Sequence, residues 1–118
     1  MAIETNLHLG TGLTRGNVFS LRRTVTNIPS GVTISSGKLT VKTNLADAIG
    51  LAIINLSATV EAAGTTGTGI IRYDFSAANN NAPVAGTLYF FDIQISMSDS
   101  SILTIEQGQT SWTEAVTT

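Results

Sequence analysis

Few residues of this sequence could act directly on a substrate. His8 is the single histidine and there is no cysteine, which excludes thiolate catalysis, zinc–thiolate sites and disulfides together. A Ser-His-Asp arrangement is arithmetically possible, but His8 would lie on a predicted edge strand, and an exposed imidazole is the simpler interpretation. Asp74 and Asp92 occupy outward positions of two predicted strands, where a glycosidase pair could sit. Acid–base catalysis needs one carboxyl group desolvated in a cleft, which nothing in the sequence predicts, so we expect no enzyme.

Three further features resemble binding sites without meeting their requirements. Gly10 to Gly16 contains three glycines, but the third falls one place too late for a phosphate-binding loop, and a strand rather than a helix follows. The turn at Asp99 and the asparagines at 79–81 lack the alternating oxygen ligands of a calcium loop. Trp112 could stack on a sugar, although a ring that plugs the end of a sandwich is the commoner role. We therefore predict no cofactor and no metal.

Composition favours a protein that packs against other protein subunits. Only 12% of the 118 residues are charged, against roughly 25% in an average soluble domain, and Thr, Ser, Gly and Asn take their place. Uncharged polar groups cost less to desolvate than ions, which suits contacts between subunits. There is no basic run and no interleaving of basic and aromatic residues, so nucleic acid is not a predicted partner.

The charges are unevenly distributed along the chain. Residues 1–72 hold all six basic residues and three acids, a sum of +3, whereas residues 73–118 hold five acids and no base, a sum of −5. Two interpretations remain open: local pairing between strands, or complementary faces for assembly. The N-terminus lacks the basic and apolar regions of a secretory signal, and no apolar segment approaches the roughly 20 residues that span a bilayer. We expect a protein made in a cytoplasm, with no membrane partner.

The strongest structural signal is a strand over residues 87–97. Alternation places Tyr89, Phe91, Ile93, Ile95 and Met97 on one face, with the remaining residues on the other. A turn at 98–101 and a returning strand over 102–105 complete a hairpin.

Other alternating segments predict further strands at 3–9, 17–26, 38–42, 51–60 and 70–76, with short helical turns at 45–49 and 77–83. The sum is an all-β antiparallel sandwich of about seven to eight strands, with almost no helix. We predict one domain over residues 1–118, with a core at 13–110 and a C-terminal tail at 111–118. Arg23, on an inward position, is expected to extend to the rim of the sandwich.

The order of several segments resembles a known family. These are Arg15-Gly16 before a strand, Lys38 to Lys42 before an acidic turn at Asp47, a glycine loop before Ile71 to Phe75, Gly86 to Gln94, and Thr104 to Gly108. Together they resemble the immunoglobulin-like domain of tailed-phage virion proteins, found at the N-terminus of baseplate upper proteins and in small stand-alone phage proteins. The resemblance covers roughly residues 13 to 110, and Asp99-Ser100-Ser101 departs from the turn expected there. It implies an immunoglobulin-like sandwich and a structural role, with no catalytic site.

Adjacent apolar residues predict a second buried surface. Neighbours on a strand point to opposite sides, so one member of each pair, such as Phe90-Phe91 or Ile102-Leu103, faces away from the core. If Ile70, Leu88, Phe90 and Ile102 share a sheet face, they form an apolar patch large enough to be an interface. We include Trp112 as a further candidate contact. Coverage by residues 43–50 or by the C-terminal tail is the alternative.

These observations lead to an expected function. We expect a non-enzymatic structural protein of a bacteriophage particle, located in the virion, that acts by assembly with copies of itself and with other virion proteins. A tail or baseplate component is the first choice, and a capsid cement or decoration protein is the alternative. A carbohydrate-binding module that uses Trp112 and loop tyrosines is the competing class, although Tyr73 and Tyr89 are both predicted to face inward.

Overall fold

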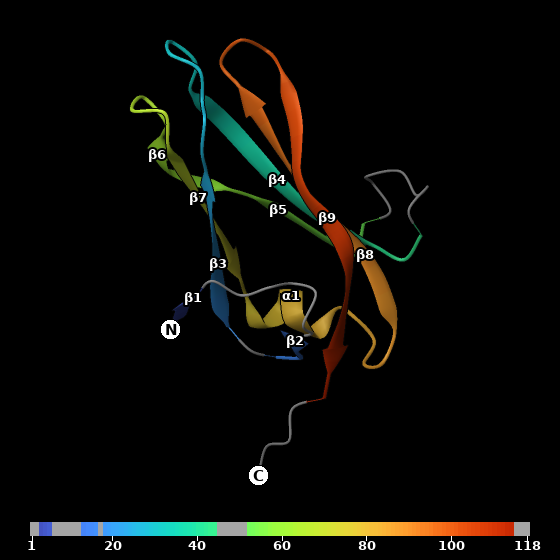
Figure 1. Ribbon diagram of the computed structural model, residues 1–118. Helices are drawn as coiled ribbons and strands as arrows, with labels where there is room; N and C mark the ends of the chain where they lie inside the picture. Colours follow the sequence, from blue (N-terminus) through green and yellow to red (C-terminus); the bar gives the residue numbers. More distant parts are fainter. Residues whose placement is uncertain (1–2, 6–12, 17, 45–51, 115–118) are drawn as a thin grey trace.

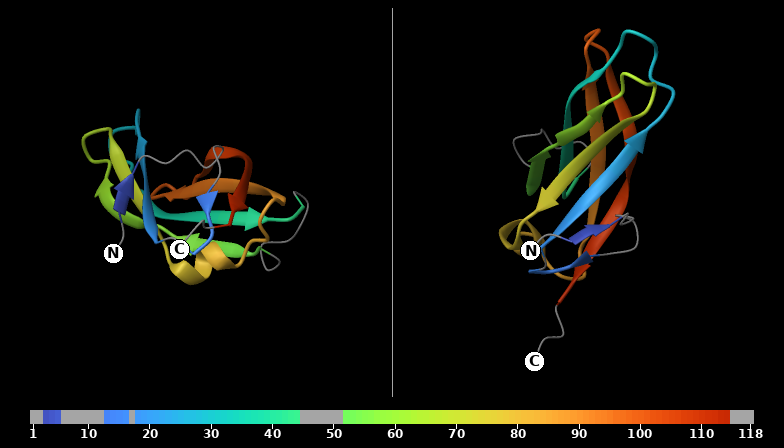
Figure 2. Two further views of the ribbon diagram at one scale, coloured as in Figure 1. Left: turned by 90° about the horizontal axis from the view of Figure 1, so that it is seen from below. Right: turned by 90° about the vertical axis from the view of Figure 1, so that its left-hand side faces the viewer.

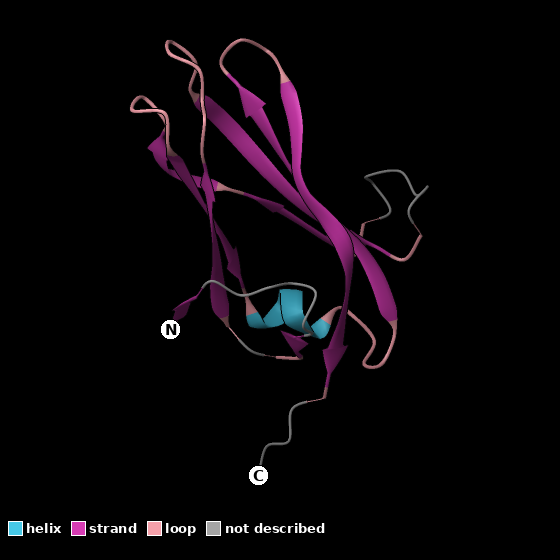
Figure 3. Cartoon of the chain, viewed as in Figure 1, coloured by secondary structure: helices cyan, strands magenta, loops and turns pink. Residues whose placement is uncertain are grey.

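The chain folds as two facing β-sheets with one short helix at one end (Figures 1 and 3). The computed structural model describes residues 3–5, 13–16, 18–44 and 52–114. Its elements are β1 (Ile3–Thr5), β2 (Leu13–Thr14), β3 (Phe19–Val25), β4 (Ile34–Lys42), β5 (Ile54–Ser57), β6 (Thr59–Ala63), β7 (Gly69–Phe75), α1 (Ala77–Asn81), β8 (Leu88–Met97) and β9 (Ile102–Thr113). One sheet has the order β1-β3-β7-β6 and the other β2-β9-β8-β4-β5. The predicted all-β sandwich is confirmed, while the helical turn predicted at 45–49 lies outside the described residues.

The strand order is that of an immunoglobulin domain. The first sheet corresponds to strands A-B-E-D and the second to G-F-C with an added neighbour of C. The predicted antiparallel pairing is wrong for two short strands, because β1 pairs parallel to β3 and β2 parallel to β9. For β1 and β3 the reason is topological. In the sequence β2 comes between them, and β2 belongs to the other sheet. The connection from β1 to β3 is therefore a crossover and not a hairpin, which permits parallel pairing.

The central strand of the second sheet matches its sequence pattern. Tyr89, Phe91, Ile93, Ile95 and Met97 of β8 are all buried, and the alternate residues point outward. The strand lies between β4 and β9, in the sheet that faces β3 and β7 (Figure 2). Its inward side chains are therefore buried between the two sheets. Period-two alternation therefore identified the core face of this strand correctly.

One hydrophobic core fills the space between the sheets. Phe19 and Phe75, neighbours on β3 and β7, stack with ring centroids 4.6 Å apart. The largest fully buried side chains are Trp112, Tyr73, Phe75, Leu21, Leu39, Ile54, Ile71, Ile93, Ile95, Val41 and Asn80. The predicted inward residues of β4 and β7 are all among them.

Helix α1 closes one end of the sandwich. Ser76 caps the helix and exchanges hydrogen bonds with Asn79 in a capping box. The next residue, Asn80, is fully buried and its Oδ1 accepts a hydrogen bond of 2.9 Å from Trp112 Nε1. The Trp112 ring meets Tyr89 edge-on at 5.9 Å.

Trp112 therefore belongs to the core. Its proposed place in a surface contact is wrong, because the ring fills the end of the sandwich and its only polar group already has a buried partner. The boundary of the predicted tail is also wrong, since β9 continues to Thr113. Nearby, the Tyr89 hydroxyl accepts a hydrogen bond of 2.8 Å from the backbone N–H of Val84. A tyrosine at the start of this strand that bonds a few residues upstream is a feature of immunoglobulin folds.

Tyr73 crosses the core toward the opposite sheet and requires a glycine there. A Cβ atom on Gly37 of β4 would lie 2.9 Å from the Tyr73 hydroxyl oxygen and 3.1 Å from the Ala58 side chain. The hydroxyl is buried and has no hydrogen-bond partner in the described part of the chain. Burial, with a smaller contribution from Asp92, raises the pKa of Tyr73 well above that of a free tyrosine, so the group stays neutral.

Asn80→Ala tests the closure of the helix end. The substitution leaves the Trp112 N–H buried without its acceptor, and we expect a loss of about 1–3 kcal/mol of unfolding free energy. Urea unfolding followed by tryptophan fluorescence measures this directly. Asn81→Ala, at the neighbouring exposed position, is the matched control and should cost under about 0.5 kcal/mol. Equal losses for the two variants would contradict the role assigned to Asn80.

Tyr73→Phe tests the unpartnered hydroxyl. Removing a buried polar group that has no partner should stabilise the fold by about 1 kcal/mol. In the same experiment Gly37→Ala should destabilise the native sequence through its contact with the hydroxyl oxygen, and should cost less in the Tyr73→Phe background. A Tyr73→Phe variant less stable than the native protein would show that the hydroxyl is satisfied.

Candidate interaction surfaces

The structure separates the residues that could have formed a catalytic pair. Asp74 lies on the outer face of the four-stranded sheet and Asp92 on the outer face of the five-stranded sheet, on opposite sides of the sandwich. His8 lies outside the described residues. Within those residues, no three His, Cys, Asp or Glu side chains gather as a metal site would require. No helix in the described ranges is long and apolar enough to cross a membrane.

The outer face of the four-stranded sheet carries a connected ion-pair network. Arg22 and Arg72 are direct cross-strand neighbours, an arrangement that would be repulsive alone. A register shift in β6 between Val60 and Ala62 accompanies the placement of Glu61, which bridges the two arginines. The Glu61 carboxylate accepts two hydrogen bonds from Arg22, of 2.5 and 2.8 Å, and one from Arg72, of 2.7 Å. Arg72 also pairs with Asp74 at 3.1 Å.

The network lowers the pKa of both carboxyl groups. For Glu61 the hydrogen bond from Arg22 is the main cause, joined by the one from Arg72. For Asp74 the main cause is the hydroxyl of Ser20, which donates a hydrogen bond of 2.6 Å, and Arg72 adds to it. The ionised forms are thus favoured, and the charges of this face are used in bonds within the chain.

The uneven charge distribution of the sequence is likewise used in local pairing. Arg15 pairs with Glu114 at 2.5 Å and Arg23 with Glu106 at 2.6 Å, each joining the basic first part to the acidic second part. The Arg23 pair joins the two sheets, because Arg23 belongs to β3 and Glu106 to β9. All four arginines are thereby paired, so the interpretation of local pairing accounts for them.

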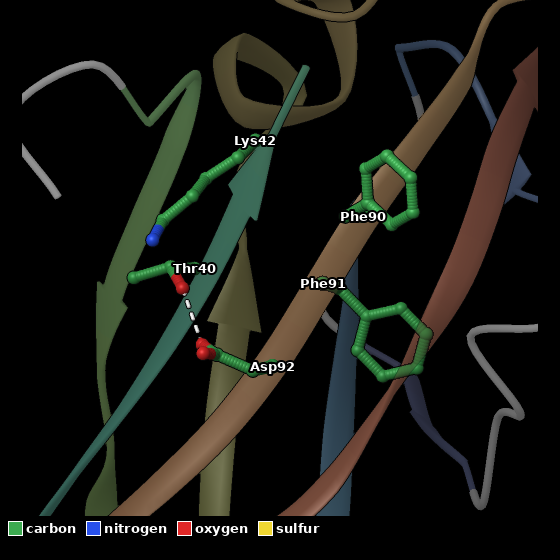
Figure 4. A pocket seen from close by; sticks show the side chains of 5 residues that line it. All are labelled: Thr40, Lys42, Phe90, Phe91 and Asp92. Atoms are coloured by element: carbon green, nitrogen blue, oxygen red, sulfur yellow. Dashed lines mark hydrogen bonds between the residues drawn. The ribbon is translucent and has the colours of Figure 1, made fainter. Parts of the chain in front are cut away.

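The outer face of the five-stranded sheet is different in character. Its outward side chains are mostly uncharged and polar, with Lys38, Lys42 and Asp92 as the charged members. Thr40 donates a hydrogen bond of 2.5 Å to Asp92, and a hollow of about 30 Å³ beside this pair has room for about one water molecule (Figure 4). Within the described ranges neither lysine has an ion-pair partner.

A larger hollow of about 350 Å³ lies on the other side of Phe90, at β9. It is lined by Phe90, Phe91, Gln107, Gly108 and Gln109. Gly108 occupies the position opposite Phe91, and a Cβ atom there would lie 3.3 Å from the Phe91 ring. This hollow was not predicted from the sequence. A glycine between two glutamines inside a strand was its one available signal, because such a glycine often marks close approach of another group.

The predicted single apolar patch is wrong. Ile70 belongs to β7 in the four-stranded sheet, on the opposite face of the molecule from Leu88 and Phe90. Ile102 pairs with Ser96, eight residues along β8 from Leu88, or about 26 Å at about 3.3 Å per residue. Alternation shows which residues point outward, but it does not show which sheet a strand joins or how far apart two outward residues lie.

Exposed apolar side chains instead gather at the two ends of the sandwich. Val18, Val84 and Leu88 are 40, 63 and 55% exposed, and all three adjoin the end closed by α1. Ile102 and Leu103 are 66 and 48% exposed, and they begin β9 at the opposite end, beyond the β8–β9 turn (Figure 1). The chain thus has two different apolar ends separated by the length of a strand.

The described sheet edges are poor sites for pairing with another strand. β5 has only four residues, and β6 carries a register shift together with the charged Glu61. β9 has a register shift opposite Ile93 and Gln94, and Glu106 turns inward to Arg23. Short strands, irregular registers and inward charges are the features that prevent edge-to-edge association. Contact through the ends or a face is therefore favoured over strand addition.

The fold and surfaces define an immunoglobulin-type sandwich with two apolar ends and one ion-paired face. Comparison of the chain with protein-family models, curated proteins and solved structures finds no match in any of the three. Its function is therefore inferred from its own residues.

Glu61→Gln tests the ion-pair network. Neutralising the bridge leaves two neighbouring arginines without their shared anion, so the thermal midpoint should fall. About 1 M salt, with a Debye length of about 3 Å, should recover part of the loss by screening the repulsion. Glu114→Gln removes an exposed single pair and is the matched control, for which we expect little change.

The same variant should alter the response to acid. Both network carboxyl groups have folded pKa values below their unfolded values, so their stabilisation is complete at neutral pH. It declines as the pH falls below about 5 and is lost as the pH passes through the lowered folded values. Glu61→Gln should weaken this dependence in denaturant titrations between neutral and acidic pH. An unchanged acid response would contradict the network's role.

Proposed function

We propose that this chain is a non-enzymatic structural component of a bacteriophage particle that acts by subunit assembly. The resemblance of its segments to tailed-phage immunoglobulin-like domains supports this, as does the immunoglobulin strand order. A tail or baseplate position is the first choice and capsid decoration the alternative. The partners are copies of itself and other proteins of the particle.

The apolar ends carry this proposal. A large apolar side chain that becomes buried contributes about 1.5–3 kcal/mol, so two or three at each end could support association. Leu88 and Val84 lie beside the helix, and Ile102 and Leu103 lie at the far end. The ion-paired face and the irregular edges offer less favourable contacts, and the exposed large apolar side chains of the described residues lie at the ends, so the ends are the preferred surfaces.

Two non-equivalent ends favour head-to-tail contact. A contact between different surfaces on identical subunits generates rings when the rotation closes and stacks when it does not, which suits a tail component. The competing carbohydrate-binding module lacks its proposed residues, because Trp112, Tyr73 and Tyr89 are at most 4% exposed. None of these three rings can stack on a ligand from solution.

Leu88→Asp and Ile102→Asp test assembly. Both positions are more than half exposed, so an aspartate should leave the fold intact while it prevents burial of that end. In sedimentation velocity each variant should lose the self-association of the native chain. A mixture of the two should form a dimer, because the intact Ile102 end of the Leu88→Asp variant can bind the intact Leu88 end of the Ile102→Asp variant. Asn55→Asp, an exposed position on β5 away from both ends, is the control and should associate normally.

The outcomes separate the alternatives. If only one variant loses association, two identical ends meet and the head-to-tail arrangement is wrong. A native chain that stays monomeric at high concentration and binds no protein of the particle would overturn the proposed function. Circular dichroism of each variant confirms that loss of association is not loss of fold.

A further inference from the structure

A further hollow, of about 380 Å³, lies on the outer face of the five-stranded sheet toward the Ile102 end. Besides Gly37 and Ala58, it is lined by six side chains from four strands, namely Ser36 and Lys38 of β4, Ser57 of β5, Gln94 and Ser96 of β8, and Ile102 of β9. Lys38 pairs directly with Ser57 and with Gln94. Ser96 pairs directly with Ser36 and with Ile102. Directly opposite residues of antiparallel strands point to the same side, so the six side chains share the outer face.

Two irregularities of strand pairing adjoin this hollow. The pairing of β4 with β8 shifts register between Ile34 and Ser36, and the pairing of β8 with β9 shifts between Ile93 and Gln94. In each case one residue at the shift lines the hollow, Ser36 on one side and Gln94 on the other. Bulges bend a strand and are over-represented next to active sites. The concave shape is thus fixed by the sheet itself, with three short serine side chains at its floor.

The polar groups of the hollow are hardly used within the chain. Among the described residues, neither the ammonium group of Lys38 nor the three serine hydroxyls have an ion pair or a hydrogen bond. Gln94 makes one long hydrogen bond, of 3.5 Å, from its Nε2 to Thr104 Oγ1, and its Oε1 accepts none from that part of the chain. The arginines of the opposite sheet face, in contrast, are engaged in ion pairs. These groups can therefore bond to a ligand at little loss of bonds within the protein.

The lining favours a ligand with one negative charge and several hydroxyl groups. Lys38 is its single charged member, so it can balance one carboxylate, whereas a nucleic-acid backbone would need several cations. No carboxylate lines the hollow, so nothing there compensates a bound cation. Serine hydroxyls and the Gln94 amide both donate and accept hydrogen bonds, as sugar hydroxyls do. Ile102, which is 66% exposed, offers an apolar contact to the C–H groups of a sugar ring.

We propose that this hollow binds a uronic acid unit of a saccharide, with the carboxylate at Lys38 and the hydroxyl groups at the serines and Gln94. Its volume of about 380 Å³ lies at the lower end of the range for ligand sites, roughly 300–1,000 Å³, which suits a single sugar unit. A shallow site for so small a ligand should bind weakly, with a Kd on the order of 1 mM.

Binding at this hollow does not require assembly of the chain. Ile102 belongs both to the hollow and to the far apolar end, so a test must keep the two roles apart. Leu88 lies six residues along β8 from Gln94, or about 20 Å at about 3.3 Å per residue. The Leu88→Asp variant therefore changes the helix end alone and leaves the hollow intact.

NMR titration of the full chain carrying Leu88→Asp tests the proposal with probes that separate charge from hydroxyl groups. D-glucuronate and D-galacturonate have both, D-glucose has hydroxyl groups alone, and N-acetyl-L-glutamic acid α-amide has a carboxylate alone. At least one uronate should shift the side-chain amide signals of Gln94, saturating with a Kd on the order of 1 mM. Glucose and the glutamic acid amide should each bind at least about tenfold more weakly, because each satisfies half of the lining. The native chain, at a concentration at which sedimentation shows a monomer, is the second sample.

Two substitutions within the hollow and one outside it locate the binding. Lys38→Gln should weaken uronate binding about three- to fivefold and remove its sensitivity to about 1 M salt. Lys42→Gln removes the same charge from the same face of β4 but lies outside this hollow, so it is the matched control and should bind normally. Ser96→Val places a larger side chain on the floor and should weaken binding at least about fivefold.

Three results would overturn the uronic acid assignment. The first is the absence of shifts with both uronates, and the second is binding that Lys38→Gln and Ser96→Val leave unchanged. The third is binding of the glutamic acid amide as tight as that of the uronates, which would assign the hollow to an acidic side chain of a partner protein. Because the titrated chain carries Leu88→Asp, its result is the same whether or not the native chain assembles. Failure of sugar binding and failure of assembly can thus be told apart.

Discussion

The hydrogen bond from Trp112 to Asn80 is the constraint on which the helix end of the sandwich depends. A sandwich with one continuous core must close its ends, and here a single buried donor and acceptor fix a five-residue helix against the last strand. The bond also positions the groups packed around it. It holds Trp112 against Tyr89, and Tyr89 in turn holds the backbone of Val84. The exposed apolar residues of this end are thereby presented on a fixed frame, which a contact between subunits requires.

The two outer faces differ in how many of their polar side chains are already hydrogen-bonded within the chain. On the four-stranded sheet two neighbouring arginines share Glu61, and the network extends to Asp74 and Ser20. A partner that covered this face would have to desolvate charges that are already paired within the chain. The cost of that desolvation would offset most of the binding free energy gained from new contacts. On the five-stranded sheet the amides of Gln107 and Gln109 have no such partners within the described chain. The five-stranded face therefore keeps more hydrogen-bonding capacity for a partner than the four-stranded face does.

Much of the fold could be predicted from the sequence because it depends on local alternation. The inward residues of β8, β4 and β7 follow directly from period-two patterns, and the short helix at 77–81 was predicted as a helical turn. The surface patch could not be predicted in the same way. Ile70 and Leu88 both point outward, but sheet membership is set by pairings between distant strands, which alternation does not encode. For Trp112 the sequence favoured the plug at the end of the sandwich, but its place among the interface residues was wrong, and its partner Asn80, 32 residues away, could not be predicted by alternation.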